Sequence, residues 1–163
     1  MRGKKEYLPL VKVEDVLSVL NKISIFGGLS REQISHVIKL LKKVFYSADE
    51  YIFRKGEEPS HIYIVRSGEV KIVVDADEGP LEIIAFETGH CFGETAVIGI
   101  QPHPASAVAV KDTELIVLSR EALLSIFDSD KELFGVLMLN IAREACRRLH
   151  QTDEILLHYV FRK

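Results

Sequence analysis

The first 43 residues carry apolar side chains at the three- and four-residue intervals of amphipathic helices. One set near the start comprises Val13, Val16, Leu17 and Leu20. Two adjacent glycines then interrupt the pattern. A second helix is predicted over residues 31–43, because Ser30-Arg31-Glu32-Gln33 has the order of a capping box and an apolar face follows it. That face consists of Ile34, Val37, Ile38 and Leu41.

Between residues 44 and 119 the pattern changes to short β-rich runs separated by turn signals. The predicted strands are Val44–Tyr46, Tyr51–Phe53, His61–Arg66, Glu69–Val74, Leu81–Phe86, Ser106–Lys111 and Thr113–Leu118. At least seven short strands at such close spacing indicate a sandwich or barrel rather than a parallel sheet with crossover helices.

The helical period returns after residue 119, with a short helix predicted over 120–127. Ser129-Asp130-Lys131-Glu132 has the order of a second capping box and opens a long run to about Tyr159. Glu144 precedes Arg147 and Arg148 at ion-pair spacing, which we assign to an exposed face.

Apolar and small residues in this run alternate steps of four and three, which is a heptad seam. The seam comprises Met138, Ala142, Ala145, Leu149, Thr152, Leu156 and Tyr159. Such spacing favours a helix–helix interface, and hence a homodimer, over packing on the β-rich region alone.

A chain of 163 residues, 47% of them apolar, has the length and composition of a single globular domain. Within it we expect N-terminal helices over 1–43, a β-roll over 44–119, and hinge and long C-terminal helices over 120–163. The net charge of −3 argues against a surface built to bind nucleic acid.

The sequence also gives no indication of a targeting signal. Apolar runs are too short to span a membrane, and no signal peptide follows the basic first residues. Two cysteines without paired spacing, Cys91 and Cys146, suit a reducing compartment. We therefore expect a cytoplasmic protein.

Two segments carry the most specific motif. Residues 89–96 read Gly-His-Cys-Phe-Gly-Glu-Thr-Ala, and residues 102–107 read Pro-His-Pro-Ala-Ser-Ala. They resemble the phosphate-binding cassette of cyclic nucleotide-binding domains, whose pattern is Gly-Asp-x-Phe-Gly-Glu-[apolar]-Ala followed by Pro-Arg-[Ala/Ser]-Ala-[Thr/Ser]-Val. Segments 52–57 and 62–70 also resemble the glycine-punctuated strands of that family, and the resemblance extends from about residue 16 to residue 157.

The resemblance implies a mainly β fold with flanking helices (α+β). This fold is a double-stranded β-helix jelly-roll with N-terminal helices and a long C-terminal dimerisation helix. It also implies a regulatory sensor module that binds a small anionic ligand, cyclic AMP or cyclic GMP. Movement of the short helix at 94–98, with a hinge around 119–130, would pass the signal to the long helix and to a separate effector protein.

The cassette has a physical rationale of its own. Backbone N–H groups of Glu94, Thr95 and Ala96 at a helix start suit an anionic oxygen, and Gly93 lets a ligand approach the main chain closely. The same Gly-Glu pair has an alternative role in shaping the turn and capping the helix.

The family assigns further roles by position. The residue matching Glu94 holds the ribose 2′-hydroxyl, and the one matching Thr152 contacts adenine across the dimer. We also expect Ser106 to add a hydroxyl near the purine. As an alternative, Thr152 is a tolerated polar position that fixes the register of the seam. The predicted ligand-binding residues are Phe92, Gly93, Glu94, Thr95, Ala96, His103, Pro104, Ala105, Ser106 and Thr152.

The cassette departs from the family at two histidines. His103 occupies the position of the arginine that clamps the cyclic phosphate, and His90 replaces an aspartate. Histidine is mostly neutral at pH 7 and makes no bidentate contact, so we expect weakened cyclic-nucleotide affinity, by roughly 10- to 150-fold. The alternative for His103 is an exposed loop residue between two prolines.

The sequence gives weaker support to other classes of function. His90 and Cys91 are adjacent at the cassette entrance and resemble the ligands of haem-binding gas sensors of this fold, although a buried Cys91 that packs as a small hydrophobe is the favoured interpretation. A metal-dependent cupin needs a His-x-His pair on one strand, and Ile62 and Tyr63 follow His61 instead. We therefore expect neither catalysis nor a metal or other cofactor.

We expect no direct DNA binding, since no recognition helix follows the long helix. Whether the chain is a stand-alone module or a piece that precedes an output domain stays open. The predicted function is a regulatory ligand-binding module, and the alternative is a scaffold protein with a vestigial pocket that acts through a helical homodimer.

Overall fold

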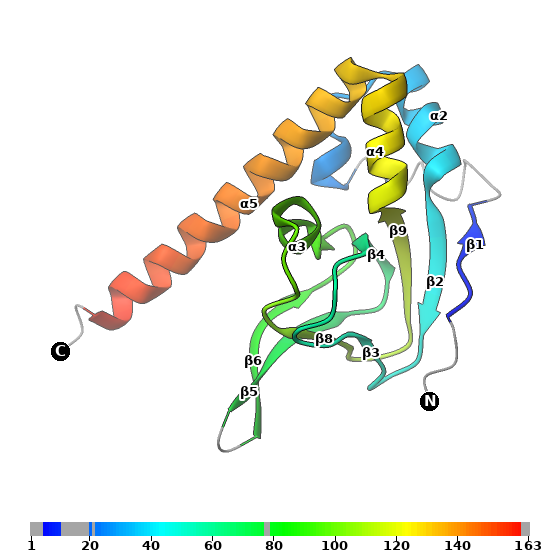
Figure 1. The fold of residues 1–163 in the computed structure, drawn as a ribbon. Helices are drawn as coiled ribbons and strands as arrows, with labels where there is room; N and C mark the ends of the chain where they lie inside the picture. Colours follow the sequence, from blue (N-terminus) through cyan, green and yellow to red (C-terminus); the bar gives the residue numbers. More distant parts are fainter. Residues whose placement is uncertain (1–4, 11–19, 21, 77–78, 161–163) are drawn as a thin grey trace.

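Two antiparallel sheets and a group of helices make up the computed structural model, which describes residues 5–10, 20, 22–76 and 79–160 (Figure 1). The five-stranded sheet has the order β1 (Leu8–Pro9), β2 (Lys42–Tyr46), β9 (Thr113–Ser119), β4 (His61–Ser67) and β7 (Cys91–Phe92). The four-stranded sheet has the order β3 (Tyr51–Phe53), β8 (Ser106–Ala109), β5 (Val70–Ala76) and β6 (Gly79–Phe86).

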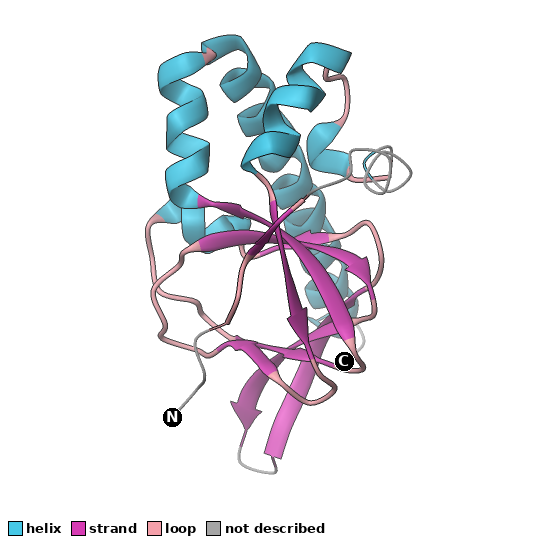
Figure 2. Cartoon of the chain, turned by 90° about the vertical axis from the view of Figure 1, so that its right-hand side faces the viewer, coloured by secondary structure: helices cyan, strands magenta, loops and turns pink. Residues whose placement is uncertain are grey.

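Apart from the second half of the longest helix, which runs on past the sheets, four helices of the described part of the chain gather at one end of this β-roll (Figure 2). They are the 3₁₀ helix η1 (Ser24–Phe26), α2 (Arg31–Leu40), α4 (Arg120–Ser129) and α5 (Lys131–Val160). A further short helix, α3 (Glu94–Gly99), follows β7. The predicted fold class, a jelly-roll with N-terminal helices and a long C-terminal helix, is confirmed.

Strand alternation divides the core into two apolar clusters. On β4, Ile62 and Ile64 face the helices, whereas Tyr63 and Val65 face the space between the two sheets. β9 repeats this division with Ile116 and Leu118 on one side and Leu115 and Val117 on the other. Both central strands are buried on both faces, which explains their nearly continuous apolar runs.

All seven predicted strands are present, with ends that shift by up to two residues. The strands β1 and β7 were not predicted, because two residues are too few to show a period. The helix predicted over 31–43 was too long, since α2 ends at Leu40. Lys42 and Lys43 instead pair with β9, and Leu41 has an extended backbone.

Helix caps were predicted correctly at one of two places. Ser30 and Gln33 form the reciprocal capping box at the start of α2. At α5 the cap is Asp130, whose Oδ1 accepts from the Leu133 N–H at 2.9 Å. Ser129 instead ends α4 by donating its hydroxyl to the Ser125 carbonyl, so the second capping box was wrong. The early helical positions Val13, Val16 and Leu17 lie outside the described residues.

The long helix α5 is fixed to the rest of the molecule along its first half. Asn140 Nδ2 donates to the carbonyls of Ile25 and Gly27 at 3.1 and 2.8 Å, and Ser24 Oγ donates to Glu144 at 3.0 Å. Beyond these contacts α5 extends past the β-roll (Figure 1). Within the part of the chain that the structure describes, no helix is long and apolar enough to cross a membrane.

The predicted heptad seam is only partly covered. Met138 packs against the helical core and Ala145 is half-buried, whereas Ala142 and Thr152 are exposed. Leu149 and Leu156 keep 62% and 56% of their surface exposed. The side chain of Tyr159 lies outside the described part.

Candidate ligand-binding site

A cavity of about 830 Å³ lies between the cassette, the strands β5 and β6, and the second half of α5. We call it the cassette cleft. The structure brings together seven of the ten predicted site residues on its walls, namely Phe92, Gly93, Thr95, His103, Pro104, Ala105 and Thr152. The other three, Glu94, Ala96 and Ser106, are buried and do not line it.

Gly93 shapes the entrance to α3. It has a left-handed backbone with φ of 81° and occupies the N-cap position of that helix. A Cβ atom there would lie 3.0 Å from the Tyr63 ring and 3.2 Å from the His61 carbonyl oxygen. The turn therefore requires glycine both for its conformation and for its space.

Glu94 joins the cassette to α5. Its carboxylate is fully buried and forms an ion pair and hydrogen bond with the Arg148 guanidinium. Burial raises the pKa of the Glu94 carboxyl above its usual range, and the Arg148 charge offsets part of that rise. Among the described residues, Glu94 Oε2 and Arg148 Nε have no hydrogen-bond partner.

Aromatic rings stack behind the cleft. Phe92 lies nearly parallel to Tyr63 and to Phe86, with centroid separations of 5.2 and 5.4 Å. The Arg148 guanidinium lies over the Phe86 ring at 5.5 Å. This stack gives the cleft a rigid apolar floor.

His103 is the most informative position of the cassette. Only 3% of its surface is exposed, and its ring stacks on Phe53 with centroids 3.6 Å apart and planes 8° from parallel. The backbone of His103 donates to the Glu57 carbonyl and accepts from the Gly56 N–H. Burial lowers the pKa of this imidazole, with the nearby Glu57 charge acting against the change. The alternative of an exposed loop histidine was wrong.

The comparisons with known proteins agree with this geometry. A family model described as a cyclic nucleotide-binding domain matches residues 43–130, more than half of the 163 residues. The chain belongs to the cyclic nucleotide-binding domain family.

Curated relatives of this domain are longer proteins. This chain is 30% identical over 132 residues to the cyclic AMP receptor protein of Thermus thermophilus, and the match covers 79% of this chain and 58% of that one. It is 29% identical over 134 residues to the cGMP-dependent protein kinase egl-4 of Caenorhabditis elegans, covering 78% and 17% respectively. The chain thus spans less than two thirds of the length of either relative.

Solved structures of the family resemble this domain throughout. A cyclic nucleotide-binding domain from Methylobacillus flagellatus has a TM-score of 0.80 at 24% identity, covering 90% of this chain and 83% of that one. The catabolite activator protein of Thermus thermophilus has a TM-score of 0.74 at 29% identity, covering 85% and 63%.

Sequence reasoning missed several residues that line the cleft of this cyclic nucleotide-binding domain, among them Phe53, Phe86 and Gln151. The missed residue that bonds to the cassette is Arg148. It was assigned to an exposed ion pair with Glu144, but Glu144 is buried and pairs with Arg147. The signal that could have identified Arg148 is its spacing. It precedes Thr152 by one helical turn, so both side chains lie on one face of α5 and reach the cleft.

Two other predicted site residues have partners of their own. The Ser106 hydroxyl accepts from the Lys55 N–H at 3.0 Å and does not reach the cavity. Thr152 is exposed, and its hydroxyl donates to the Arg148 carbonyl at 3.0 Å.

Cys91 and His90 differ in exposure. Burial raises the pKa of the Cys91 thiol to about 12, in agreement with a side chain that packs in the helical core. His90 is exposed, and its Nδ1 lies within hydrogen-bond distance of the Glu87 backbone. No group of three or more potential metal ligands occurs among the described residues.

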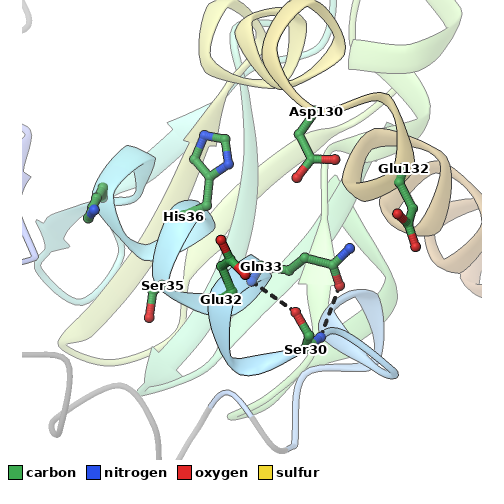
Figure 3. Close-up of a pocket in the computed structure, with 8 residues that line it drawn as sticks. Ser30, Glu32, Gln33, Ser35, His36, Asp130 and Glu132 are labelled. Carbon is green, nitrogen blue, oxygen red and sulfur yellow. Dashed lines mark hydrogen bonds between the residues drawn. The ribbon is translucent and has the colours of Figure 1, made fainter.

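A second, polar cavity of about 570 Å³ lies between α2 and the junction of α4 with α5 (Figure 3). Its side chains include Ser30, Gln33, His36, Asp130 and Glu132. Ser30 and Gln33 cap α2, and Asp130 caps α5. Three of these polar side chains therefore already serve the helix ends, and we take the cassette cleft as the candidate site.

Proposed function

We propose that this chain is a regulatory ligand-binding module whose ligand occupies the cassette cleft and whose output is the position of α5. The observation that carries the proposal is the buried contact between Glu94 and Arg148, which links the cassette to α5 at a residue, Arg148, that lines the cleft. A ligand that engages Glu94 competes with Arg148 and changes how firmly α5 is held.

Cyclic nucleotides are the ligand class that the family indicates, because the relatives are named as a cyclic AMP receptor and a cGMP-dependent kinase. In the proposed mode, Glu94 accepts from a ligand hydroxyl and the backbone N–H groups of residues 94–96 donate to a ligand oxygen. His103 in the arginine position weakens the affinity for the cyclic phosphate.

The proposed module is a cytoplasmic, non-enzymatic domain that spans residues 1–163 and acts on a separate effector. The family model that matches residues 43–130 of this chain describes a binding domain.

A label on α5 tests this proposal. Cys146 is exposed on α5, whereas Cys91 is buried with a raised thiol pKa, so a maleimide fluorophore labels Cys146 selectively. Titration with cyclic AMP or cyclic GMP to millimolar concentration should give a saturable fluorescence change. Absence of both binding heat and fluorescence change with either nucleotide would contradict the proposal.

A second candidate function is that of a scaffold that acts through a helical homodimer. It is favoured by the exposed apolar side chains on the second half of α5, Leu149, Leu156 and Leu157. In either function we expect a dimer through the seam that contains Met138, Ala142, Ala145, Leu149 and Leu156. Leu149→Lys should halve the mass measured by light scattering, while a Leu139→Lys variant outside the seam should leave the mass unchanged.

A further inference from the structure

The charges and apolar surface of the cassette cleft indicate the chemical class of its ligand. We propose that the cleft takes an uncharged, largely apolar ligand in preference to an anionic cyclic phosphate. This inference rests on the proposed function, in which the cleft is the ligand site, and it concerns which kind of molecule binds there.

The cleft offers no uncompensated positive charge among its described lining residues. Two of these residues, Glu82 and Arg148, are formally charged at neutral pH. The Arg148 charge is already balanced by the buried Glu94, and Glu82 adds a negative charge. An anion entering the cleft would lose its hydration without gaining a counter-charge, which is costly in a partly enclosed site.

His103 does not replace the missing cation. Its ring is packed flat against Phe53, and both its backbone N–H and its carbonyl are bonded to the 56–57 turn. The lowered pKa that follows from burial keeps the imidazole neutral at pH 7. A neutral imidazole donates a single hydrogen bond, whereas the guanidinium expected at this position presents a charged fork.

The walls of the cleft are apolar on several sides. Phe53, Phe86 and Phe92 contribute aromatic rings, and Ile72 and Leu156 contribute aliphatic side chains. At the rim, on β6, Leu81 and Ile83 each leave 56% of their surface exposed. An apolar ligand would cover this surface and remove it from water.

The polar groups of the cleft suit a neutral ligand as well. Thr95, Gln151 and Thr152 supply hydroxyl and amide groups without formal charge. Such groups bind a hydroxyl, carbonyl or amide of a ligand and fix its orientation. The volume of about 830 Å³ falls within the range that encloses a small organic molecule.

A pair of probes that differ by one charge tests the inference. The probes are cyclic AMP and its methyl phosphotriester, which has the same base and sugar but no charge. The neutral dye N-phenyl-1-naphthylamine reports occupancy by its fluorescence in the cleft. We expect the triester to displace the dye at a concentration at least about tenfold lower than cyclic AMP requires.

Two variants sharpen the comparison. His103→Arg should reverse the preference, so that cyclic AMP displaces the dye more effectively than the triester does. Ile83→Lys introduces a cation at the exposed rim, where the fold tolerates it. This variant should reduce the difference between the concentrations of cyclic AMP and of the triester that displace the dye. His36→Arg on α2 lies outside the cleft and should leave the preference unchanged.

The outcomes separate this inference from the proposed function. Preference for cyclic AMP, or equal affinity for the two probes, in the unmodified protein would overturn the inference and leave the cleft as a cyclic-nucleotide site. Failure of the dye, the triester and cyclic AMP alike to bind would overturn both. A preference for the triester that His103→Arg and Ile83→Lys leave unchanged would also overturn the inference, because charge would not be its cause.

Discussion

The two halves of α5 belong to one continuous helix but have different surroundings. In the first half, Leu133, Leu137 and Ile141 are buried in the helical core. In the second half, Leu149 and Leu156 are more than half exposed, although the helical pattern is as regular there. Arg148 stands near the boundary between the halves and bonds to the cassette.

This difference distinguishes a half of α5 that is fixed by core packing from a half that has few packing contacts. The first half is held by apolar packing and by the bonds of Asn140 and Glu144 to the η1 region. The second half forms one wall of the cassette cleft and is held there through Arg148. Under the proposed function, we therefore expect a ligand in the cleft to act on the second half while the first half keeps α5 attached.

The largest expected effect is on stability. Leu137→Ala empties a fully buried position in the first half and should lower the free energy of unfolding by about 2–5 kcal/mol. The matched change Leu156→Ala, at an exposed position of the second half, should alter it by less than about 0.5 kcal/mol at dilute, monomeric concentration. Urea unfolding monitored by circular dichroism measures both, and equal losses would show that the halves are packed alike.

Removal of Arg148 should have the next largest effect. Arg148→Ala leaves the Glu94 carboxylate buried without its counter-charge, and we expect a loss of about 3 kcal/mol at pH 7. The matched Arg147→Ala removes a more exposed cation, and Glu144 keeps its hydrogen bond from Ser24, so this variant should cost less than Arg148→Ala.

The loss in Arg148→Ala should depend on pH with a definite sign. Without Arg148, folded Glu94 keeps its proton to higher pH than the unfolded chain does, so stability falls as pH rises above about 4.5. Unfolding at pH 5 should therefore show a smaller loss than unfolding at pH 7. A loss that does not change between these pH values would mean that Glu94 reaches solvent once Arg148 is removed.

A large part of the fold could be predicted from the sequence because periodicity reports which faces are buried. The runs of β4 and β9 predicted strands, and the Gly93-Glu94 motif predicted the turn into α3. The end of α2 at Leu40 could not be predicted, because pairing of Lys42 with β9 overrides the helical pattern.

The sequence predicted those parts of the candidate site whose residues are close together along the chain. The cassette residues fall together because they are consecutive, whereas Arg148 meets Glu94 across 54 positions of the chain. The apolar pattern of α5 also fits two neighbouring faces, and only the packing shows that Leu133 and Leu137 face the core while Leu149 stays exposed.

The smallest expected effect is on the pH dependence of stability, to which His103 of the cassette contributes. His103 and His61 both have a pKa lowered chiefly by burial, so the unfolded chain takes up protons more readily than the folded one. The contribution of these two histidines to stability should be at its full value above pH 6.5 and fall as pH drops below it. His103→Gln should show a shallower fall in melting temperature between pH 6.5 and 5, and an unchanged slope would show that His103 titrates equally in both states.

Hydrogen exchange along α5 tests the central claim most directly. Without ligand, amides of residues 133–144 should be strongly protected, and those of residues 149–158 should exchange much faster. Saturation of the cleft with the methyl phosphotriester of cyclic AMP should change the exchange of residues 146–158 and leave residues 133–144 as they were. Equal protection along the helix, or a ligand effect confined to residues 133–144, would contradict the account.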